Sequence, residues 1–409
     1  MSEDSITLTV DPFLLPTTQH RAGLAGLMVL TETMRRRGMG PLPEIRPDGA
    51  GRYLITLTQA ALCSALNDLY DATLEERGFP NKLKGSLASG EAREPKRVEK
   101  QTDQETGKDK TVYIYDQLVP KGAFLHALGM PSAWIKLWRD AVWSTIRGVP
   151  KTRLPFESRR DGRDVEEASR LWLALGNLKE PTLDISSSLL IGAQAVHADN
   201  IPFQGRPSET LLLHFWPVVM GVFQPQSLDR DGKSSLDGYV LAIPDVVDFQ
   251  SFLEDFTDYV AGLSPDMAGF RPKAAVISVP EEGGLEYAAA LAAITRARHR
   301  ESSLHFSTAS VEIYHLRKRG NNIPLLHSGR VPVEPGLLHS YEAIRNRYNH
   351  PVFRRQLILN LLRGSCWYSG FHDLFSRYPS AWFLGASGGR FQFDFRRKTQ
   401  LTQEAAPNA

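Results

Sequence analysis

The sequence is poor in cysteine and has no long apolar run. Among its 409 residues only Cys63 and Cys366 are cysteines, and they lie far apart, which argues against a disulfide framework and a cysteine-rich zinc site. No apolar run approaches the ~20 residues that a membrane helix needs, and the acidic N-terminus does not resemble a secretory signal. These absences predict a cytoplasmic protein in a reducing compartment, with no membrane partner.

Several sequence motifs of common enzymes are also missing. The chain has no G-x-x-x-x-G-K-[ST] phosphate loop, no strand-associated G-x-G-x-x-G and no H-E-x-x-H zinc motif. His372 and Asp373 could ligate a metal, but a metal hydrolase needs several further ligands at helical spacing. We therefore expect a protein that is not an enzyme, with no catalytic residue, metal or cofactor. The alternative is a metal-dependent nuclease whose carboxylates are scattered along the chain.

Charge is distributed unevenly, although the formal net charge is only +2. Residues 290–398 hold 17 Lys and Arg against 6 Asp and Glu, a net of +11, whereas residues 1–289 hold 31 against 39, a net of −8. This asymmetry suggests a polyanion as the partner of the basic part. On charge alone, a solvated basic surface is an equally good interpretation.

Hydrophobic periodicity predicts an α+β fold of mixed helices and short antiparallel strands. Helices are expected over residues 16–37, 59–71, 249–263, 285–298 and 337–363, the last interrupted at Pro351. Strands are expected over residues 53–57, 112–115, 185–191, 210–215, 239–243, 274–279, 311–316 and 391–395. These elements suggest an N-terminal α+β domain over residues 1–285 and a basic α+β region over residues 286–400. Residues 81–110 are expected to form a mobile basic insertion, and residues 401–409 a disordered tail.

Four segments carry a family resemblance. They are DPFLLPTTQHRAGLAGL at residues 11–27, NDLYDA at 67–72, VPKGAFL at 119–125, and IGAQA at 191–195 leading to LLLHFWP at 211–217. Their order and spacing resemble the CRISPR-associated large subunit of type I interference complexes (Cascade), in its MYXAN subtype. Gly23 and Gly26, three residues apart on a predicted helix, allow another backbone to approach closely. The first segment therefore predicts packing rather than chemistry.

The resemblance implies a non-catalytic subunit that recognises the protospacer-adjacent motif in target double-stranded DNA. It implies contact with the 5′ end region of the guide RNA (crRNA) and with the backbone and 5′-handle-binding subunits of Cascade. It also implies recruitment of a nuclease-helicase or a transposition adaptor. Family members can carry a C-terminal helical bundle, but the predicted strand at residues 391–395 suggests that the bundle is absent or separately encoded. A purely structural RNA-binding subunit is a further alternative.

Candidate contacts follow from side-chain chemistry. Motif reading needs amide or guanidinium groups at base edges, which favours Gln194, Asn200, Gln204 and Arg206 on one polar connection between predicted strands. An ordinary polar turn is the alternative. The candidates for phosphate contact are Lys121 beside Gly122, the run Arg317, Lys318 and Arg319 after a strand, and the helical residues Arg345, Arg347, Arg354 and Arg355. The apolar residues of this helical region occupy its core-facing stripe, so we expect these arginines to face outward, and the local shortage of acidic residues favours a binding role for them.

Overall fold

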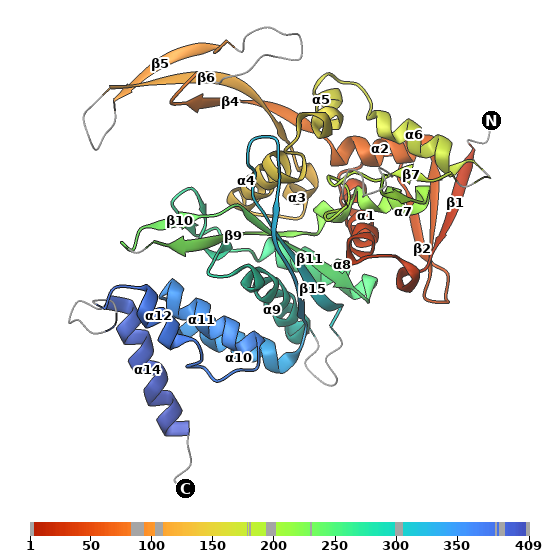
Figure 1. Ribbon diagram of the computed structural model, residues 1–409. Helices are drawn as coiled ribbons and strands as arrows, with labels where there is room; N and C mark the ends of the chain where they lie inside the picture. The colour runs from red at the N-terminus through yellow and green to blue at the C-terminus, as the bar shows by residue number, and fades with distance from the viewer. Residues whose placement is uncertain are drawn as a thin grey trace.

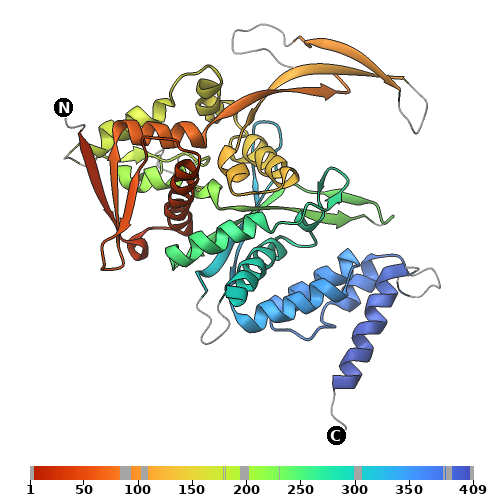
Figure 2. The same cartoon turned by 180° about the vertical axis from the view of Figure 1, so that it is seen from behind.

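The computed structural model describes residues 4–82, 94–102, 109–177, 179, 181–193, 202–229, 231–298, 306–380, 383 and 389–405. The fold is α+β, as predicted. A central sheet lies among helices, a long β-ribbon projects from the body, and the C-terminal helices form a separate group on the other side of the sheet (Figure 1, and from behind in Figure 2). Among the described helices, none is long and apolar enough to cross a membrane.

The central sheet joins strands from distant parts of the chain. Its order is β10 (Ser234–Leu236), β9 (Gly221–Leu228), β11 (Tyr239–Val246), β15 (Thr308–Leu316) and β16 (Leu325–Pro332), all antiparallel. The short β14 (Val276–Ile277) pairs in parallel with β9. The predicted strands at residues 239–243 and 311–316 are confirmed as parts of β11 and β15.

Helices cover both faces of this sheet. Gly283 of α9 (Pro280–Arg298) packs against Val240, whereas Arg21 of α1 (Thr18–Arg36) pairs with Asp245. Val240 and Asp245 are five positions apart in the strand, an odd spacing, and therefore point to opposite faces of β11. α8 (Phe249–Ala261) lies beside α1 and α9. Burial on both faces explains the continuous apolar sequence of β11.

Gly23 and Gly26 allow another segment of backbone to approach α1 closely, as predicted. α1 runs against the segment that links α7 (Pro207–Leu213) to the short 3₁₀-helix η4 (Trp216–Val218). A Cβ atom on Gly23 or Gly26 would overlap the backbone carbonyl of Leu212 or Phe215. Two of the segments that carry the family resemblance therefore pack directly against each other.

A small sheet begins the chain. Its strand order is β1 (Ser5–Val10), β3 (Tyr53–Thr58) and β2 (Glu44–Pro47). The 3₁₀-helix η1 (Pro12–Leu14) follows β1, and the Asp11 side chain accepts a hydrogen bond from the Phe13 amide at 2.9 Å. α2 (Gln59–Leu69) starts directly after β3, where the Thr58 hydroxyl accepts a hydrogen bond from the Ala61 amide at 3.1 Å.

The projecting ribbon has the strand order β4 (Ala72–Phe79), β6 (Asp109–Pro120) and β5 (Arg97–Thr102). Its β5 lies inside residues 81–110, where we expected a mobile insertion. β5 pairs with β6 along its whole length, and Lys96 and Arg97 also form ion pairs with Glu76 of β4, at 3.0 and 2.6 Å. Basic residues that looked unpaired along the sequence therefore have partners across the ribbon.

A series of short helices follows the ribbon in the chain. They are α3 (Ala123–Ala127), α4 (Ser132–Ala141), the π-helix η2 (Val142–Ile146), the 3₁₀-helix η3 (Pro150–Arg153), α5 (Leu154–Arg160) and α6 (Glu166–Leu175). Trp134 and Trp138 of α4 are buried. Small two-stranded sheets join β7 (Leu183–Asp184) to β8 (Gln204–Gly205) and β12 (Met267–Ala268) to β13 (Arg271–Pro272), and η5 (Lys273–Ala275) precedes β14.

The C-terminal part is helical. It contains α10 (Pro335–Arg347), α11 (Pro351–Leu362), α12 (Phe371–Arg377) and α14 (Gly389–Ala405), with the predicted break before Pro351. The strand expected at residues 391–395 is wrong, because this segment begins α14. The expected disordered tail is wrong for residues 401–405, which complete α14, and residues 406–409 lie outside the described residues. The strand-based argument against a C-terminal helical bundle is therefore withdrawn.

Two other expected strands are wrong. Residues 210–215 belong mainly to α7, and residues 185–191 form turns after β7. The expected domain boundary after residue 285 falls inside α9, and the central sheet takes strands from both sides of it. The two predicted regions therefore share one core.

Candidate nucleic-acid interface

Polar residues at the end of α2 hold neighbouring elements in place. The Asn67 side chain donates to Asp164 at 2.8 Å and accepts from the Val165 amide at 3.0 Å, at the start of α6. Asp68 receives two hydrogen bonds from Arg37 after α1, at 2.8 and 2.5 Å. Bidentate pairing fixes both position and orientation. This family-like segment therefore positions α1 and α6.

Lys121 occupies the junction between the ribbon and α3. Its ammonium lies 2.9 Å from Asp71, and its side chain is half exposed. Arg139 donates two hydrogen bonds to the Lys121 carbonyl, at 3.1 and 2.7 Å. An exposed ion pair of this kind contributes little to stability, so its ammonium can exchange a carboxylate for a phosphate. The geometry is thus compatible with phosphate contact at Lys121.

The connection expected to read DNA is described only in part. Gln194 and Asn200 lie outside the described residues. Gln204 lies in β8 and exchanges hydrogen bonds with its neighbours, donating to Asp184 at 3.0 Å and accepting from Thr182 at 3.0 Å. Arg206 is exposed at the start of α7, and no ion pair involves its side chain among the described residues. Gln204 has a structural task, whereas Arg206 is available to a ligand.

The four predicted arginines of α10 and α11 divide into two pairs. Arg345 binds Glu286 at 2.9 Å, and Arg354 forms ion pairs with Glu282 and Glu286, both on α9. The expectation that Arg354 faces outward is wrong, because its acidic partners come from a helix distant in sequence. Arg347 and Arg355 are exposed, and no ion pair involves them within the described part of the chain.

A group of cations lies where the turn between β15 and β16 meets η3. We call Lys151, Arg153, Lys318 and Arg319 the basic junction. Lys318 and Arg319 are exposed on the turn, and Arg153 lies close enough for its charge to act on Lys318. Partial burial, followed by the Arg153 charge, lowers the pKa of the Lys318 ammonium. The two segments also touch at Gly148 and Ile323.

The basic junction has few acidic partners. Of the three predicted residues on its turn, Arg317 binds Asp237 at 2.8 Å. No ion pair involves Lys151, Lys318 or Arg319 among the residues that the structure describes. The Arg153 guanidinium stacks on the Trp143 ring at 4.3 Å and donates to the carbonyls of Arg147 and Trp143. Lysine and arginine side chains that form no ion pair within the described part of the chain, such as Lys151, Lys318 and Arg319, are available to a polyanionic ligand.

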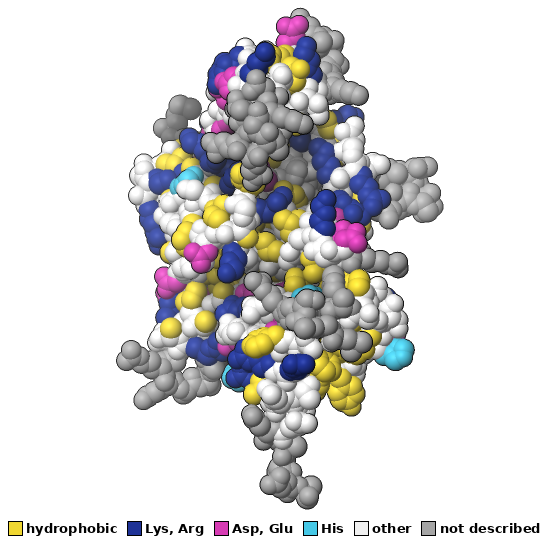
Figure 3. Space-filling model, turned by 90° about the vertical axis from the view of Figure 1, so that its left-hand side faces the viewer, with side chains coloured by type: hydrophobic (Ala, Val, Ile, Leu, Met, Phe, Trp, Pro, Cys, Tyr) yellow, Lys and Arg dark blue, Asp and Glu magenta, His cyan; other side chains and the backbone are white. Residues whose placement is uncertain are grey.

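The turn between β15 and β16 rises beside α4, beneath the ribbon (Figure 1). Figure 3 shows the side of the molecule from which the ribbon projects. Lys and Arg side chains lie around a hollow below this projection, with fewer Asp and Glu side chains among them. A hollow bordered by cations is the surface form expected of a nucleic-acid contact.

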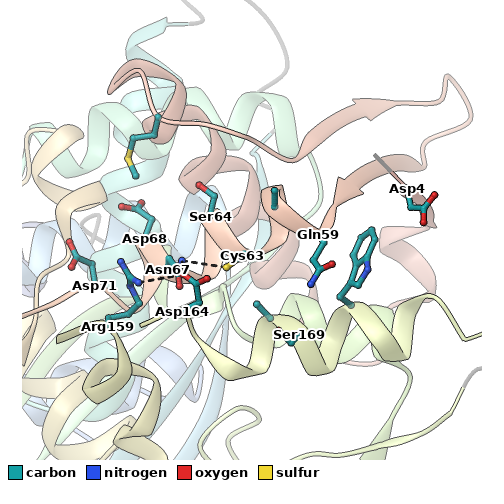
Figure 4. A pocket seen from close by; sticks show the side chains of 14 residues that line it. Asp4, Gln59, Cys63, Ser64, Asn67, Asp68, Asp71, Arg159, Asp164 and Ser169 are labelled. Carbon is teal, nitrogen blue, oxygen red and sulfur yellow. Dashed lines mark hydrogen bonds and ion pairs between the residues drawn. The ribbon is translucent and has the colours of Figure 1, made fainter. Parts of the chain in front are cut away.

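A second groove tests the nuclease alternative. It has a volume of about 800 Å³ and is lined by Asp4, Asp68, Asp71 and Asp164 together with Cys63, Asn67 and Arg159 (Figure 4). These carboxylates do not converge on one point. Asp68 and Asp71 bind Arg37 and Lys121, and Asp164 lies between Asn67 and Arg159, at 2.8 and 3.7 Å. Within the described ranges, no group of three or more His, Cys, Asp or Glu side chains is arranged to hold a metal ion.

Comparison with protein families gives two adjacent matches. The model of the Type I-B CRISPR Cas8b N-terminal domain matches residues 42–301, and that of the Type I-B CRISPR Cas8b C-terminal domain matches residues 308–408. The chain belongs to the Type I-B CRISPR Cas8b family. It is a large subunit of a type I CRISPR effector complex, which confirms the resemblance at that level. A search of curated proteins found no match.

The family matches place the division of this Cas8b chain between residues 301 and 308, rather than after residue 285. This division falls between α9 and β15 and leaves α9 intact, whereas the predicted boundary after residue 285 lies inside α9. Lys151 and Arg153 were not among the contact residues predicted from the sequence. Their signal was present, because residues 147–153 contain three cations and no carboxylate.

Proposed function

We propose that this Cas8b chain is a non-catalytic subunit that recognises the protospacer-adjacent motif in duplex DNA and contacts the 5′ end region of the guide RNA. The observation that carries the proposal is the basic junction. Most arginines of the N-terminal part and the sheet have a carboxylate partner, whereas Lys151, Lys318 and Arg319 form no ion pair with any described residue. Phosphate contacts of this type supply affinity without sequence information.

Motif reading needs groups beyond the basic junction. Arg206 is the described member of the Gln194 to Arg206 connection whose side chain is available, and a guanidinium can form two hydrogen bonds with a guanine edge. We assign phosphate contact to Lys121, Lys318 and Arg319, with Arg347 and Arg355 as further cations on the C-terminal helices. Membership of the MYXAN subtype and a cytoplasmic location form part of this proposal.

The C-terminal helices supply a surface for other proteins. α10, α11, α12 and α14 stand apart from the ribbon and leave Arg347 and Arg355 exposed. We assign to this chain contacts with the other Cascade subunits and recruitment of a nuclease-helicase or a transposition adaptor. The helical character of this part agrees with family members that carry a C-terminal bundle.

Target binding by the assembled complex tests the proposal. The complex is reconstituted with a guide RNA, and its affinity for matching duplex DNA is measured at several salt concentrations. Each phosphate contact contributes about −0.9 to the log–log slope, so Lys318→Ala/Arg319→Ala should make it less steep by up to about 1.8. Arg46→Ala, which changes an exposed arginine of β2, is the matched control and should leave the slope unchanged.

Two outcomes favour the alternatives. An unchanged slope in Lys318→Ala/Arg319→Ala, with normal assembly on the guide RNA, would support a structural RNA-binding subunit. Cleavage of labelled DNA or RNA by the pure chain with Mg²⁺ or Mn²⁺, abolished by one carboxylate substitution such as Asp164→Asn, would establish a nuclease.

A further inference from the structure

A second cavity lies on the body, near the basic junction. It has a volume of about 620 Å³, and its lining includes Tyr70, Arg147, Ser188, Thr210 and His214. All five residues are more than nine-tenths buried, with 2, 7, 8, 4 and 4% of their surfaces exposed. Cavities of about 300–1,000 Å³ are typical of small-molecule sites. The cavity is therefore large enough for one nucleotide.

Arg147 is a buried cation that forms no ion pair with any carboxylate of the described residues. Its guanidinium donates to the Tyr70 hydroxyl at 2.5 Å and to the Ser188 hydroxyl at 3.2 Å, and it lies over the Tyr70 ring at 5.2 Å. A guanidinium has five N–H donors, so these contacts leave several unused. Arg354, another largely buried arginine, meets two carboxylates. A buried charge needs compensation, which an anion in the cavity would provide.

The two groups that accept hydrogen bonds from Arg147 carry no charge at neutral pH, and the Glu167 carboxylate lies near enough for its charge to act on Tyr70. The Tyr70 hydroxyl lies 2.7 Å from His214 Nδ1. Burial, followed by the Arg147 charge, lowers the pKa of His214 to about 3, and burial raises the pKa of Tyr70 to about 12. The Thr210 hydroxyl lines the same cavity and is buried without a hydrogen-bond partner. The cavity thus offers one fixed cation and unused polar groups.

Charged groups on the remaining walls restrict the ligand. Lys151 adds a second, exposed cation, and Arg170 is paired with Glu166. Glu167 and Asp184 also line the cavity, and Asp184 accepts a hydrogen bond from Gln204. A bare anion would suit Arg147 and Lys151 but not these carboxylates. A ligand with a phosphate at one end and hydroxyl or amino donors at the other suits both sides.

We propose that this cavity binds one nucleotide, with its phosphate against Arg147 and Lys151 and its sugar or base donors toward Glu167 and Asp184. This inference rests on the proposed function in one respect: the nucleotide is taken to be part of a nucleic-acid single strand that the protein binds. Guide RNA, displaced target DNA and a free nucleotide share this chemistry. A nucleotide turned out of a strand would anchor that strand next to the basic junction.

Calorimetric titration of the full chain tests the proposal with adenosine 5′-monophosphate, adenosine, and five-nucleotide single strands of RNA and DNA. Adenosine 5′-monophosphate should bind at least about tenfold more tightly than adenosine, because the phosphate contacts two cations. Arg147→Lys and Lys151→Met should each weaken nucleotide binding by about tenfold or more. Lys151 is exposed, so its variant tests the site without disturbing the core.

Lys233→Met, at an exposed lysine before β10, is the control and should bind like the unchanged chain. Thermal unfolding shows whether Arg147→Lys is folded. Tighter binding of the RNA or of the DNA strand identifies the source of the nucleotide. Absence of nucleotide binding, or equal binding by Lys151→Met and the unchanged chain, overturns the proposal. Target binding by the complex can succeed or fail independently, which separates this result from a test of the proposed function.

Discussion

Arg354 of α11 forms an ion pair with Glu282 of α9, a carboxylate with no exposed surface. Glu282 also accepts hydrogen bonds from the Ser278 amide and from the Tyr341 hydroxyl, at 2.5 and 3.3 Å. This contact links the C-terminal helices to the helix that covers the central sheet. It therefore couples the part matched by the C-terminal family model to the part matched by the N-terminal one.

Arg354→Met should lower the free energy of unfolding by roughly 3–5 kcal/mol at pH 7.5, because it leaves the buried Glu282 carboxylate without its counter-charge. Burial already raises the pKa of Glu282. In the variant the folded state should bind a proton more strongly than the unfolded chain does. The loss should therefore shrink as the pH falls toward 5. Urea unfolding at the two pH values measures both effects.

Arg355→Met is the matched control for this prediction, since Arg355 is exposed on the same helix. It should change the free energy of unfolding by less than about 0.5 kcal/mol at either pH. An Arg354→Met loss equal to that of the control would show that the buried pair does not stabilise the junction.

Gly23→Ala and Gly26→Ala should each lower the free energy of unfolding by at least roughly 1–3 kcal/mol, because the added methyl group meets a backbone carbonyl that cannot move freely. Gly336→Ala in α10 has no atom within 4 Å of the added Cβ and is the control. It should be neutral or slightly stabilising. Thermal unfolding of the three variants measures these differences. Equal stability of all three variants would contradict the close packing of α1.

Acid should destabilise the protein through His214. Burial holds its pKa in the folded chain at about 3, below the ordinary histidine value of 6.5, so the unfolded chain takes up the proton first as the pH falls. Between pH 7 and pH 5 this single group should reduce the free energy of unfolding by about 2 kcal/mol. His214→Asn should remove that part of the pH dependence, whereas His339→Asn, at an exposed histidine, should retain it.

Substitutions within the Gln194 to Arg206 connection should separate stability from recognition. Gln204→Ala breaks the bonds to Asp184 and Thr182 and should cost about 0.5–1.5 kcal/mol of stability. Arg206→Ala should leave stability unchanged and weaken the preference of the complex for its motif by about 1–3 kcal/mol if Arg206 reads a base pair. Binding to a library of randomised motifs measures this preference. An unchanged library profile would remove Arg206 from the interface.

Local patterns predicted much of the fold. The Pro351 break is visible in the sequence because of the proline, and the amphipathic α8 because of its helical period. The strands β11 and β15 are visible as short runs rich in β-branched and aromatic residues. The glycine spacing of α1 was also informative, since Gly23 and Gly26 have few other reasons to recur on one buried face.

The errors have physical causes. Residues 210–215 are buried on all sides in a helix, so their apolar run carries no helical period. In residues 391–395, Phe391 and Phe395 lie one helical turn apart and both join an aromatic cluster with Phe353, whereas Phe393 is 62% exposed. An alternating pattern therefore concealed a helix face.

The candidate site was harder to predict than the fold. The acidic partners of Arg345 and Arg354 lie 59 to 72 residues earlier in the chain, so local charge counting found none. The sequence also could not show that Arg147 is buried and forms no ion pair with a described carboxylate, because both properties depend on the fold. The sequence identified the right residue types, but the fold decides which of these cations already have an acidic partner within the protein.

The shared central sheet also sets an order of events during synthesis. β11 hydrogen-bonds to β9 on one side, but its other neighbour, β15, begins at Thr308. While the ribosome makes α8 and α9, the free edge of β11 stays open to any extended peptide. The N-terminal family region therefore completes its sheet only after the next region has left the ribosome, and a chain released between residues 301 and 308 should aggregate.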